Sequence, residues 1–208
     1  MRTHVGIFGG TFDPVHEGHC AVARAVQIAC SFSRMIWMPA GHPWQKSAIN
    51  APINHRLSML SKAVLQLPGH EISLHEAYND GITYTIETVR ALRGDLGYDF
   101  PLTLVLGWDS FSGIGTWKNG IDILNEVNLA VVPRYGLGKC LLDPVLSLWR
   151  KRQRCLFYGQ YYGAVLDVPM VSFDVSSSFV KDKIREIGSC PGLPPGVAAY
   201  VSAYSIYK

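Results

Sequence analysis

Gly9 to His19 read Gly-Gly-Thr-Phe-Asp-Pro-Val-His-Glu-Gly-His, and they directly follow the short apolar run from His4 to Phe8. That run has the length of a buried strand, and Val22, Val26 and Ala29 come next at helical spacing. The stretch therefore joins a first strand to a first helix. In an open α/β sheet, ligands bind beyond the carboxyl ends of the strands, and the N-terminus of a following helix attracts phosphate. We expect a phosphate-binding loop here.

The loop begins with two adjacent glycines, Gly9 and Gly10, which let the backbone approach a phosphate closely. Its spacing is neither the Gly-x-Gly-x-x-Gly of dinucleotide-binding folds nor the P-loop pattern that ends in Gly-Lys-Ser/Thr. Asp13-Pro14 has the composition of a helix-start signal, with the first turn beginning there or one or two residues later. The sequence therefore predicts a phosphate-binding loop that belongs to neither of these two motifs.

His16 and His19 are three residues apart with Gly18 between them, so both imidazoles can project from the same side of one helical turn. Imidazole N–H groups can stabilise the negative charge that develops on phosphorus oxygens during nucleotidyl transfer. The pair could also bind a metal ion, but its spacing does not match a zinc motif. Phosphate contact is the favoured interpretation.

Short apolar runs alternate with segments of helical periodicity, which is typical of β-α units that feed a parallel sheet. We expect an α/β fold, a Rossmann-like open parallel sheet with helices on both faces, in a single domain of residues 1–208. The expected strands are residues 4–8, 35–38, 71–74, 102–106, 129–132 and 169–173. Apolar stripes predict further helices over 86–96, 180–187 and 197–204, the last two in a C-terminal helical part of about 175–208. The pattern weakens over 136–163, where we expect a variable insertion.

The composition excludes several classes of protein. With 48% hydrophobic and 17% charged residues, the chain is too apolar to be disordered. No apolar run approaches the roughly 20 residues of a membrane-spanning helix. The N-terminus lacks the apolar core of a secretory signal, so we expect a cytoplasmic protein with no membrane partner. The five cysteines include no Cys-x-x-Cys pair that would indicate zinc or redox chemistry.

The net charge of +3 is too small for a domain-wide nucleic-acid-binding field, although it suits phosphate-bearing substrates. A basic cluster from Arg150 to Arg154 precedes several aromatic residues between Phe157 and Tyr162. This combination could form a nucleic-acid patch, but a solvated helix face is the favoured interpretation. We expect no nucleic-acid partner, and the sequence leaves open whether copies of the chain form a homo-oligomer.

The motif from Gly9 to His19 resembles the signature of the HxGH nucleotidyltransferase superfamily, which implies a Rossmann-like fold of the nucleotidyltransferase type. Three further segments resemble bacterial nicotinate-nucleotide adenylyltransferase in order and spacing, so the resemblance covers nearly the whole chain. These segments are Pro39 to Lys46, Tyr84-Thr85 together with Leu106 to Trp117, and Val175 to Lys181.

The resemblance implies transfer of AMP from ATP to nicotinate mononucleotide, which yields nicotinate adenine dinucleotide and pyrophosphate in NAD biosynthesis. It also implies Mg²⁺ bound mainly through the ATP phosphates, without a dedicated protein metal site. The implied catalytic residues are His16, His19 and Lys46. The implied ATP-binding residues are Gly9, Gly10, Thr11, Phe12, His19, Gly107, Asp109, Ser176, Ser177 and Lys181, and the implied acceptor-binding residues are Thr85, Trp117 and Arg134.

Several positions depart from the family's pattern. The two residues before Lys46 are not the usual ones, so Lys46 could also be an ordinary surface lysine. Lys181 stands where the family has arginine, and lysine lacks the bidentate fork that suits phosphate. Arg185, one turn later, could share its task. The residue after Arg134 is not the usual proline.

Three alternative interpretations stay open. The same chemistry could act on nicotinamide mononucleotide or phosphopantetheine, although phosphopantetheine enzymes lack the segments around Asp109 and Trp117. A non-catalytic nucleotide-binding regulator could keep the fold and the pocket, but the intact histidine pair argues against it. Ser176 and Ser177 could act only as helix caps, which any such helix needs.

Overall fold

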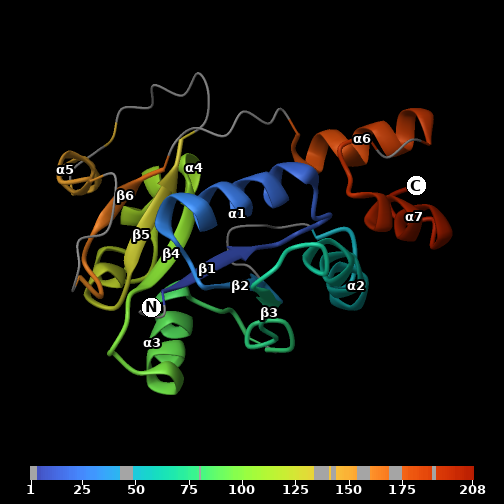
Figure 1. Cartoon of the computed structure of the whole chain (residues 1–208). Helices are drawn as coiled ribbons and strands as arrows, with labels where there is room; N and C mark the ends of the chain where they lie inside the picture. The colour runs from blue at the N-terminus through green and yellow to red at the C-terminus, as the bar shows by residue number, and fades with distance from the viewer. Residues whose placement is uncertain are drawn as a thin grey trace.

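The computed structural model describes residues 4–42, 49–79, 81–133, 141, 144–153, 160–168, 175–188 and 191–208. Within these ranges, one sheet has the strand order β3-β2-β1-β4-β5-β6, and neighbouring strands are parallel (Figure 1). Because β1 lies between β2 and β4, the order of the strands reverses at the β1–β4 pair. The strands are β1 Val5–Gly10, β2 Arg34–Pro39, β3 His70–Ile72, β4 Leu102–Gly107, β5 Asn128–Val132 and β6 Val165–Asp167.

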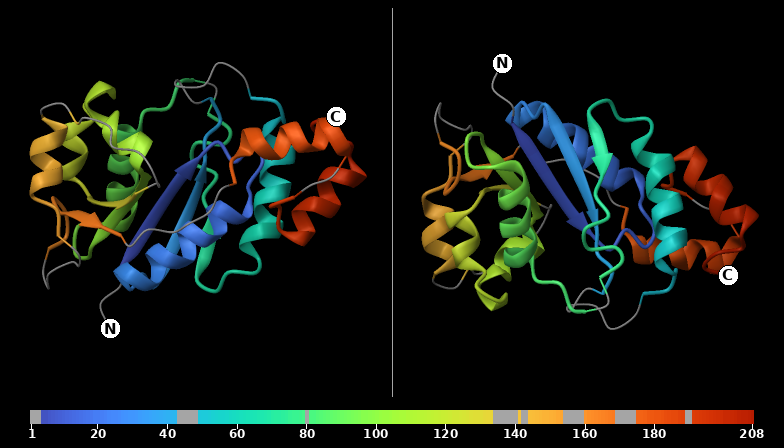
Figure 2. Two further views of the ribbon diagram at one scale, coloured as in Figure 1. Left: turned by 90° about the horizontal axis from the view of Figure 1, so that it is seen from above. Right: turned by 90° about the horizontal axis from the view of Figure 1, so that it is seen from below.

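Helices cover both faces of the sheet, with α1 on one face and α3 on the other (Figures 1 and 2). No helix in the described part of the chain is both long enough and apolar enough to cross a membrane. The α-helices are α1 Glu17–Cys30, α2 Ile53–Val64, α3 Thr85–Leu96, α4 Trp108–Ser112, α5 Val145–Arg150, α6 Ser177–Ile187 and α7 Pro195–Ala203; the 3₁₀ helices are η1 Ile114–Thr116 and η2 Ile121–Asn125.

Alternating side chains of the central strands divide the apolar residues into two cores. Val5 and Ile7 of β1 pack with Leu104 of β4 in the core beneath α3. Phe8 of β1 and Val105 of β4 point the other way, into the core beneath α1. This alternation is expected for strands that are buried on both faces, because successive side chains point to opposite sides of a sheet.

The predicted α/β fold is confirmed, and the strands expected over 4–8, 35–38, 71–74, 102–106 and 129–132 are present as β1 to β5 with small shifts at their ends. The strand β6 was not predicted, because it is only 3 residues long and directly follows the region without a clear pattern. The strand expected over 169–173 lies outside the described residues. The helices expected after His19 and over 86–96, 180–187 and 197–204 are present as α1, α3, α6 and α7.

Helix α2 was missed by the sequence analysis because its buried face includes a charged residue, Arg56. The Arg56 side chain is almost completely buried, and it donates hydrogen bonds to the carbonyl oxygens of Thr11 at 2.7 Å, Ala40 at 2.8 Å and Gly41 at 3.4 Å. Burial lowers the pKa of the Arg56 guanidinium, but an arginine keeps its charge in proteins. Arg56 therefore ties the loop that follows β1 to the loop that follows β2.

Replacing Arg56 by Met is expected to lower the free energy of unfolding by about 3 kcal/mol or more, because three carbonyl groups lose a charged donor. Urea denaturation would measure this loss. Arg34→Met is the matched control, since Arg34 is 44% exposed and pairs with Glu71 at the surface. A surface pair contributes about 1 kcal/mol at most, and equal losses in the two variants would contradict the role given to Arg56.

Candidate active site

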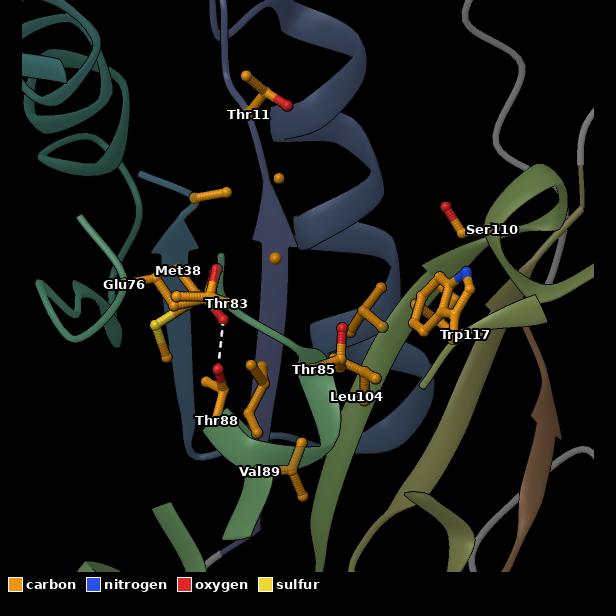
Figure 3. Close-up of a pocket in the computed structure, with 16 residues that line it drawn as sticks. Thr11, Met38, Glu76, Thr83, Thr85, Thr88, Val89, Leu104, Ser110 and Trp117 are labelled. Carbon is orange, nitrogen blue, oxygen red and sulfur yellow. Dashed lines mark hydrogen bonds between the residues drawn. The ribbon is translucent and has the colours of Figure 1, made fainter. Parts of the chain in front are cut away.

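A cavity of about 250 Å³ lies where the strand order reverses, at the carboxyl ends of β1 and β4 (Figure 3). Open α/β sheets bind their ligands at such a point. The cavity brings the predicted phosphate loop and the predicted acceptor residues together. Its walls include Gly9, Gly10 and Thr11 from the first loop and Thr85, Ser110 and Trp117 from the segments around α3 and α4.

The phosphate loop leaves β1 through two positions without side chains. A Cβ atom at Gly9 would meet no other atom within 4 Å, so this position is open toward the cavity. A Cβ atom at Gly10 would lie 2.9 Å from the ring of Phe12, which leaves no room for a side chain. The two glycines therefore leave the backbone of the loop accessible from the cavity.

Phe12 anchors the loop. Its φ angle of 48° lies in the left-handed region, which costs a non-glycine residue about 1–2 kcal/mol. Its ring is buried in the core, 5.2 Å from the His19 ring and 5.3 Å from the Trp37 ring between centroids. Since the side chain is in the core, the contact of Phe12 with ATP that the sequence predicts would have to be made by its backbone.

The two predicted histidines meet at the start of α1. His16 occupies the N-cap position, and its ring centroid lies 3.7 Å from that of His19. Nδ1 of His19 accepts a hydrogen bond from the backbone N–H of His16 at 3.2 Å. A neutral His19 ring that accepts at Nδ1 carries its hydrogen on Nε2, which makes Nε2 a donor. A Cβ atom at Gly18 would lie only 3.0 Å from Nδ1 of His16, so the glycine leaves space for the His16 ring.

Asp13 does not start the helix, so this part of the sequence interpretation is wrong. The helix begins at Glu17, and the N-cap residue is His16. The physical reason is that the Asp13 carboxylate accepts hydrogen bonds from residues distant in sequence. It therefore does not accept one from a backbone N–H of the first turn of α1.

The Asp13 carboxylate is buried and accepts hydrogen bonds from several donors. These are the backbone N–H of Asn50 at 2.9 Å, that of Ala51 at 3.1 Å and the hydroxyl of Tyr207 at 2.7 Å, with Nζ of Lys181 at 3.5 Å. Burial alone would raise the pKa of the Asp13 carboxyl, but these donors outweigh it and hold the pKa below its ordinary value. Asp13 therefore stays ionised and connects the histidine loop to three other parts of the chain.

The serines at the start of α6 have structural partners. Oγ of Ser176 accepts a hydrogen bond from the backbone N–H of Phe179 at 3.1 Å and caps the helix. The hydroxyl of Ser177 donates to the carbonyl oxygen of Pro14 at 3.1 Å. Both serines therefore help to place α6 beside the histidine loop, and Figure 1 shows α6 next to the N-terminal end of α1.

Lys181 points toward the same region from the next turn of α6. Its ammonium group donates to Oδ1 of Asn50 at 2.8 Å and lies 3.5 Å from the Asp13 carboxylate. The side chain is only 15% exposed, so its charge is directed inward. Arg185, by contrast, pairs with Asp182 on the surface of the same helix. The geometry favours Lys181 over Arg185 as the cation near the phosphate loop.

The other end of the cavity contains the predicted acceptor residues. Thr85 is the first residue of α3, where backbone N–H groups lack partners within the helix. The half-buried indole of Trp117 also lines this part of the cavity (Figure 3). Glu76 and Thr88 form a further wall, in which the hydroxyl of Thr88 donates to the Glu76 carboxylate at 2.5 Å. Burial raises the pKa of the Glu76 carboxyl.

The remaining predicted site residues are placed as follows. Gly107 ends β4 and Asp109 lies in the first turn of α4, at the same edge of the sheet as the cavity. Lys46 and Arg134 lie outside the described residues. The described part of the chain contains no group of three or more His, Cys, Asp or Glu side chains that could hold a metal ion.

The sequence analysis missed several residues of the site. Thr88 could have been found, because it lies three residues after Thr85 and so faces the same side of a helix. Glu76 and Asn50 lie in irregular segments, and nothing in the local pattern indicates their contacts. Tyr207 resembles any aromatic residue of an apolar helix end, and only the tertiary structure brings it to Asp13.

Comparison with known proteins supports one family over almost the entire chain. Residues 7–183 match the model of the cytidylyltransferase-like family. A probable nicotinate-nucleotide adenylyltransferase of Bordetella parapertussis is 32% identical over 208 residues, covering 99% of this chain and 98% of the relative. One of Neisseria meningitidis is 31% identical over 207 residues, covering 98% of both chains.

A solved structure is similar in fold. Nicotinic acid mononucleotide adenylyltransferase of Plasmodium falciparum, complexed with NaAD, superposes with a TM-score of 0.73 at 18% identity, covering 99% of this chain and 97% of that one. Its low identity supports the fold alone. The match over residues 7–183 and the identity along the full length decide the family. The chain belongs to the cytidylyltransferase-like family and, within it, to the nicotinate-nucleotide adenylyltransferases.

Proposed function

We propose that this chain transfers AMP from ATP to nicotinate mononucleotide, forming nicotinate adenine dinucleotide and pyrophosphate in NAD biosynthesis. One observation carries the proposal. A single cavity at the switch point of the sheet is lined both by the loop that leads into the histidine pair and by Thr85 and Trp117. The phosphates of two substrates can therefore meet between these two walls.

The chemistry needs positioning and charge stabilisation more than a reactive side chain. An oxygen of the acceptor's 5′-phosphate forms a bond to the α-phosphorus of ATP, and the bond from that phosphorus to the bridging oxygen breaks, releasing pyrophosphate. The nucleophile is already an anion, so no covalent enzyme intermediate is required. Nε2–H of His19 and the ring of His16 would stabilise the charge on the α-phosphate oxygens in the transition state.

The other predicted contacts complete the nucleotide side of the proposal. Backbone groups of Gly9 to Phe12 would approach the phosphates, helped by the positive end of α1. Gly107 and Asp109 would lie near the adenosine. Ser176, Ser177, Lys46 and Lys181 would contact the triphosphate, and the two lysines would neutralise the leaving pyrophosphate.

Magnesium would be held mainly by the phosphate oxygens of ATP, and it would reduce the charge that the incoming acceptor phosphate meets. The donor set of the described residues fits this arrangement. Asp13, three residues before His16, already accepts hydrogen bonds from protein donors, so its carboxylate is not free to bind a metal ion. The ion would therefore arrive with the nucleotide.

The acceptor side of the cavity suits a nicotinate ring. The indole face of Trp117 can stack on a cationic pyridinium ring, which adds an electrostatic attraction to the apolar contact. Backbone N–H groups at the start of α3, beside Thr85, would receive the ring's carboxylate, and fixed donors select an acid over an amide. The resemblance implies that Arg134 would also contact the acceptor.

A direct assay separates this proposal from its rivals. Pyrophosphate release is measured with ATP and either nicotinate mononucleotide or nicotinamide mononucleotide. We expect a higher kcat/KM for the acid. A preference for the amide would move the function to a different acceptor. Tight nucleotide binding without turnover on either acceptor would instead support a non-catalytic regulator.

Replacing His16 by Ala is expected to reduce kcat by about 100-fold or more, because the variant loses a group that stabilises the transition state. The KM values should change far less, since this contact is strongest in the transition state. Steady-state kinetics with both substrates would measure the effect, and circular dichroism would verify the fold.

His70→Gln is the matched control for that variant. His70 starts β3 at the opposite edge of the sheet, where its ring bonds Trp37 and Gln27 at 2.9 Å each. It should keep the kcat of the unmodified protein. A His16→Ala variant as active as this control would refute the proposed mechanism.

Replacing Trp117 by Ala is expected to raise the KM for nicotinate mononucleotide by about 10-fold, in line with roughly 1–3 kcal/mol for an aromatic ring stacked on a base. The KM for ATP should stay the same. Trp149→Ala is the control, because Trp149 is also a half-buried tryptophan but packs on Trp108, 4.8 Å away between ring centroids, and does not line the cavity. An unchanged acceptor KM in Trp117→Ala would argue against stacking.

A further inference from the structure

The C-terminal part of the chain touches the histidine loop at successive points. The hydroxyl of Ser177 donates to the carbonyl oxygen of Pro14 at 3.1 Å. The backbone N–H of Glu17 donates to the carbonyl oxygen of Gly192 at 2.8 Å. These two contacts lie on either side of the residues that lead into His16. The loop is therefore held from outside as well as by its own strand and helix.

Tyr207 makes the shortest of these contacts, a hydrogen bond to Asp13. Its ring is 7% exposed and belongs to the core beneath α1, and its hydroxyl donates to Oδ1 of Asp13 at 2.7 Å. A hydrogen bond to a carboxylate is roughly twice as strong as one between neutral groups. Burial raises the pKa of the Tyr207 hydroxyl, so the group remains a donor at neutral pH. The Tyr207 backbone has a φ of 71°, a left-handed conformation that the surrounding contacts must maintain.

Asp13 links the Tyr207 hydroxyl to the loop that carries His16. It is three residues before His16, whose buried ring lies 3.7 Å from that of His19 between centroids, with the two planes tilted by 35°. The same carboxylate also accepts from the backbone of Asn50 and Ala51, so a change at Asp13 would displace both loops at this edge of the sheet. A shift of about 1 Å in a catalytic group can reduce a rate by about 100-fold.

We propose that Tyr207 is a positioning residue for nucleotidyl transfer, whose hydroxyl holds Asp13 and thereby the placement of the histidine pair. The inference rests on the proposed function of the site. Tyr207 would not touch either substrate. Its effect would reach the reaction only through the loop.

A purely structural role for Tyr207 makes a different prediction. Loss of a structural hydrogen bond lowers the melting temperature but leaves the kcat of the folded molecules unchanged. Loss of positioning lowers kcat and kcat/KM together while the KM values change little, because the histidines act mainly in the transition state. The division between kcat and KM therefore separates the two roles.

The experiment compares Tyr207→Phe, which removes only the hydroxyl, with Tyr200→Phe. Tyr200 lies on α7, and its hydroxyl bonds Nδ1 of His55 on α2 at 3.1 Å, far in sequence from the histidine loop. Both variants lose one tyrosine hydrogen bond. Rates are measured with ATP and nicotinate mononucleotide well below each melting temperature, and they are divided by the folded fraction from circular dichroism.

We expect kcat to fall about 10-fold in Tyr207→Phe, with both KM values nearly unchanged. Tyr200→Phe should lose thermal stability and keep its kcat. A Tyr207→Phe variant with the kcat of Tyr200→Phe would overturn the inference, as would a rise in KM at constant kcat. Absence of turnover in the unmodified protein would overturn the proposed function itself, which is a distinguishable result.

Discussion

The buried carboxylate of Asp13 is the constraint on which the rest of the site depends. An ionised group in the interior is tolerated only when other groups satisfy it, and an unpaired buried charge would cost several kcal/mol. Here the donors come from the segment after β2, from α6 and from Tyr207, which follows α7. The position of Asp13 thus requires distant parts of the chain to converge at the start of α1.

This convergence explains how a strained loop can remain in place. Phe12 has a left-handed backbone and a ring locked in the core, and Arg56 bonds the carbonyl oxygen of Thr11 just before it. Each of these features restricts the backbone between β1 and His16. A loop with so few accessible conformations would present its donors to a phosphate without reorganisation, which is the condition for effective electrostatic stabilisation.

Local patterns in the sequence predicted most of the helices and strands and the proximity of the two histidines, but they could not predict long-range contacts. The spacing of His16 and His19 and the apolar run before Gly9 depend on neighbours within a few residues, and both predictions agree with the structure. Asp13 was assigned to the helix start because no local signal indicates that its partners lie at Asn50 and Tyr207. Helix α2 was missed for a related reason: a buried arginine is stabilised by carbonyl groups that the sequence does not place beside it.

The two ends of the cavity differ in how their loops are held. The end beside the histidine loop depends on buried, charged hydrogen bonds to Asp13 and from Arg56. At the acceptor end, α3 and the segment around Trp117 are joined at the surface, where Lys118 pairs with Glu87 at 2.7 Å. Exposed pairs of this kind contribute about 0–1 kcal/mol, so this pair itself adds little to stability. In the proposed function, this surface pair can therefore change without disturbing the loop that leads into the histidine pair.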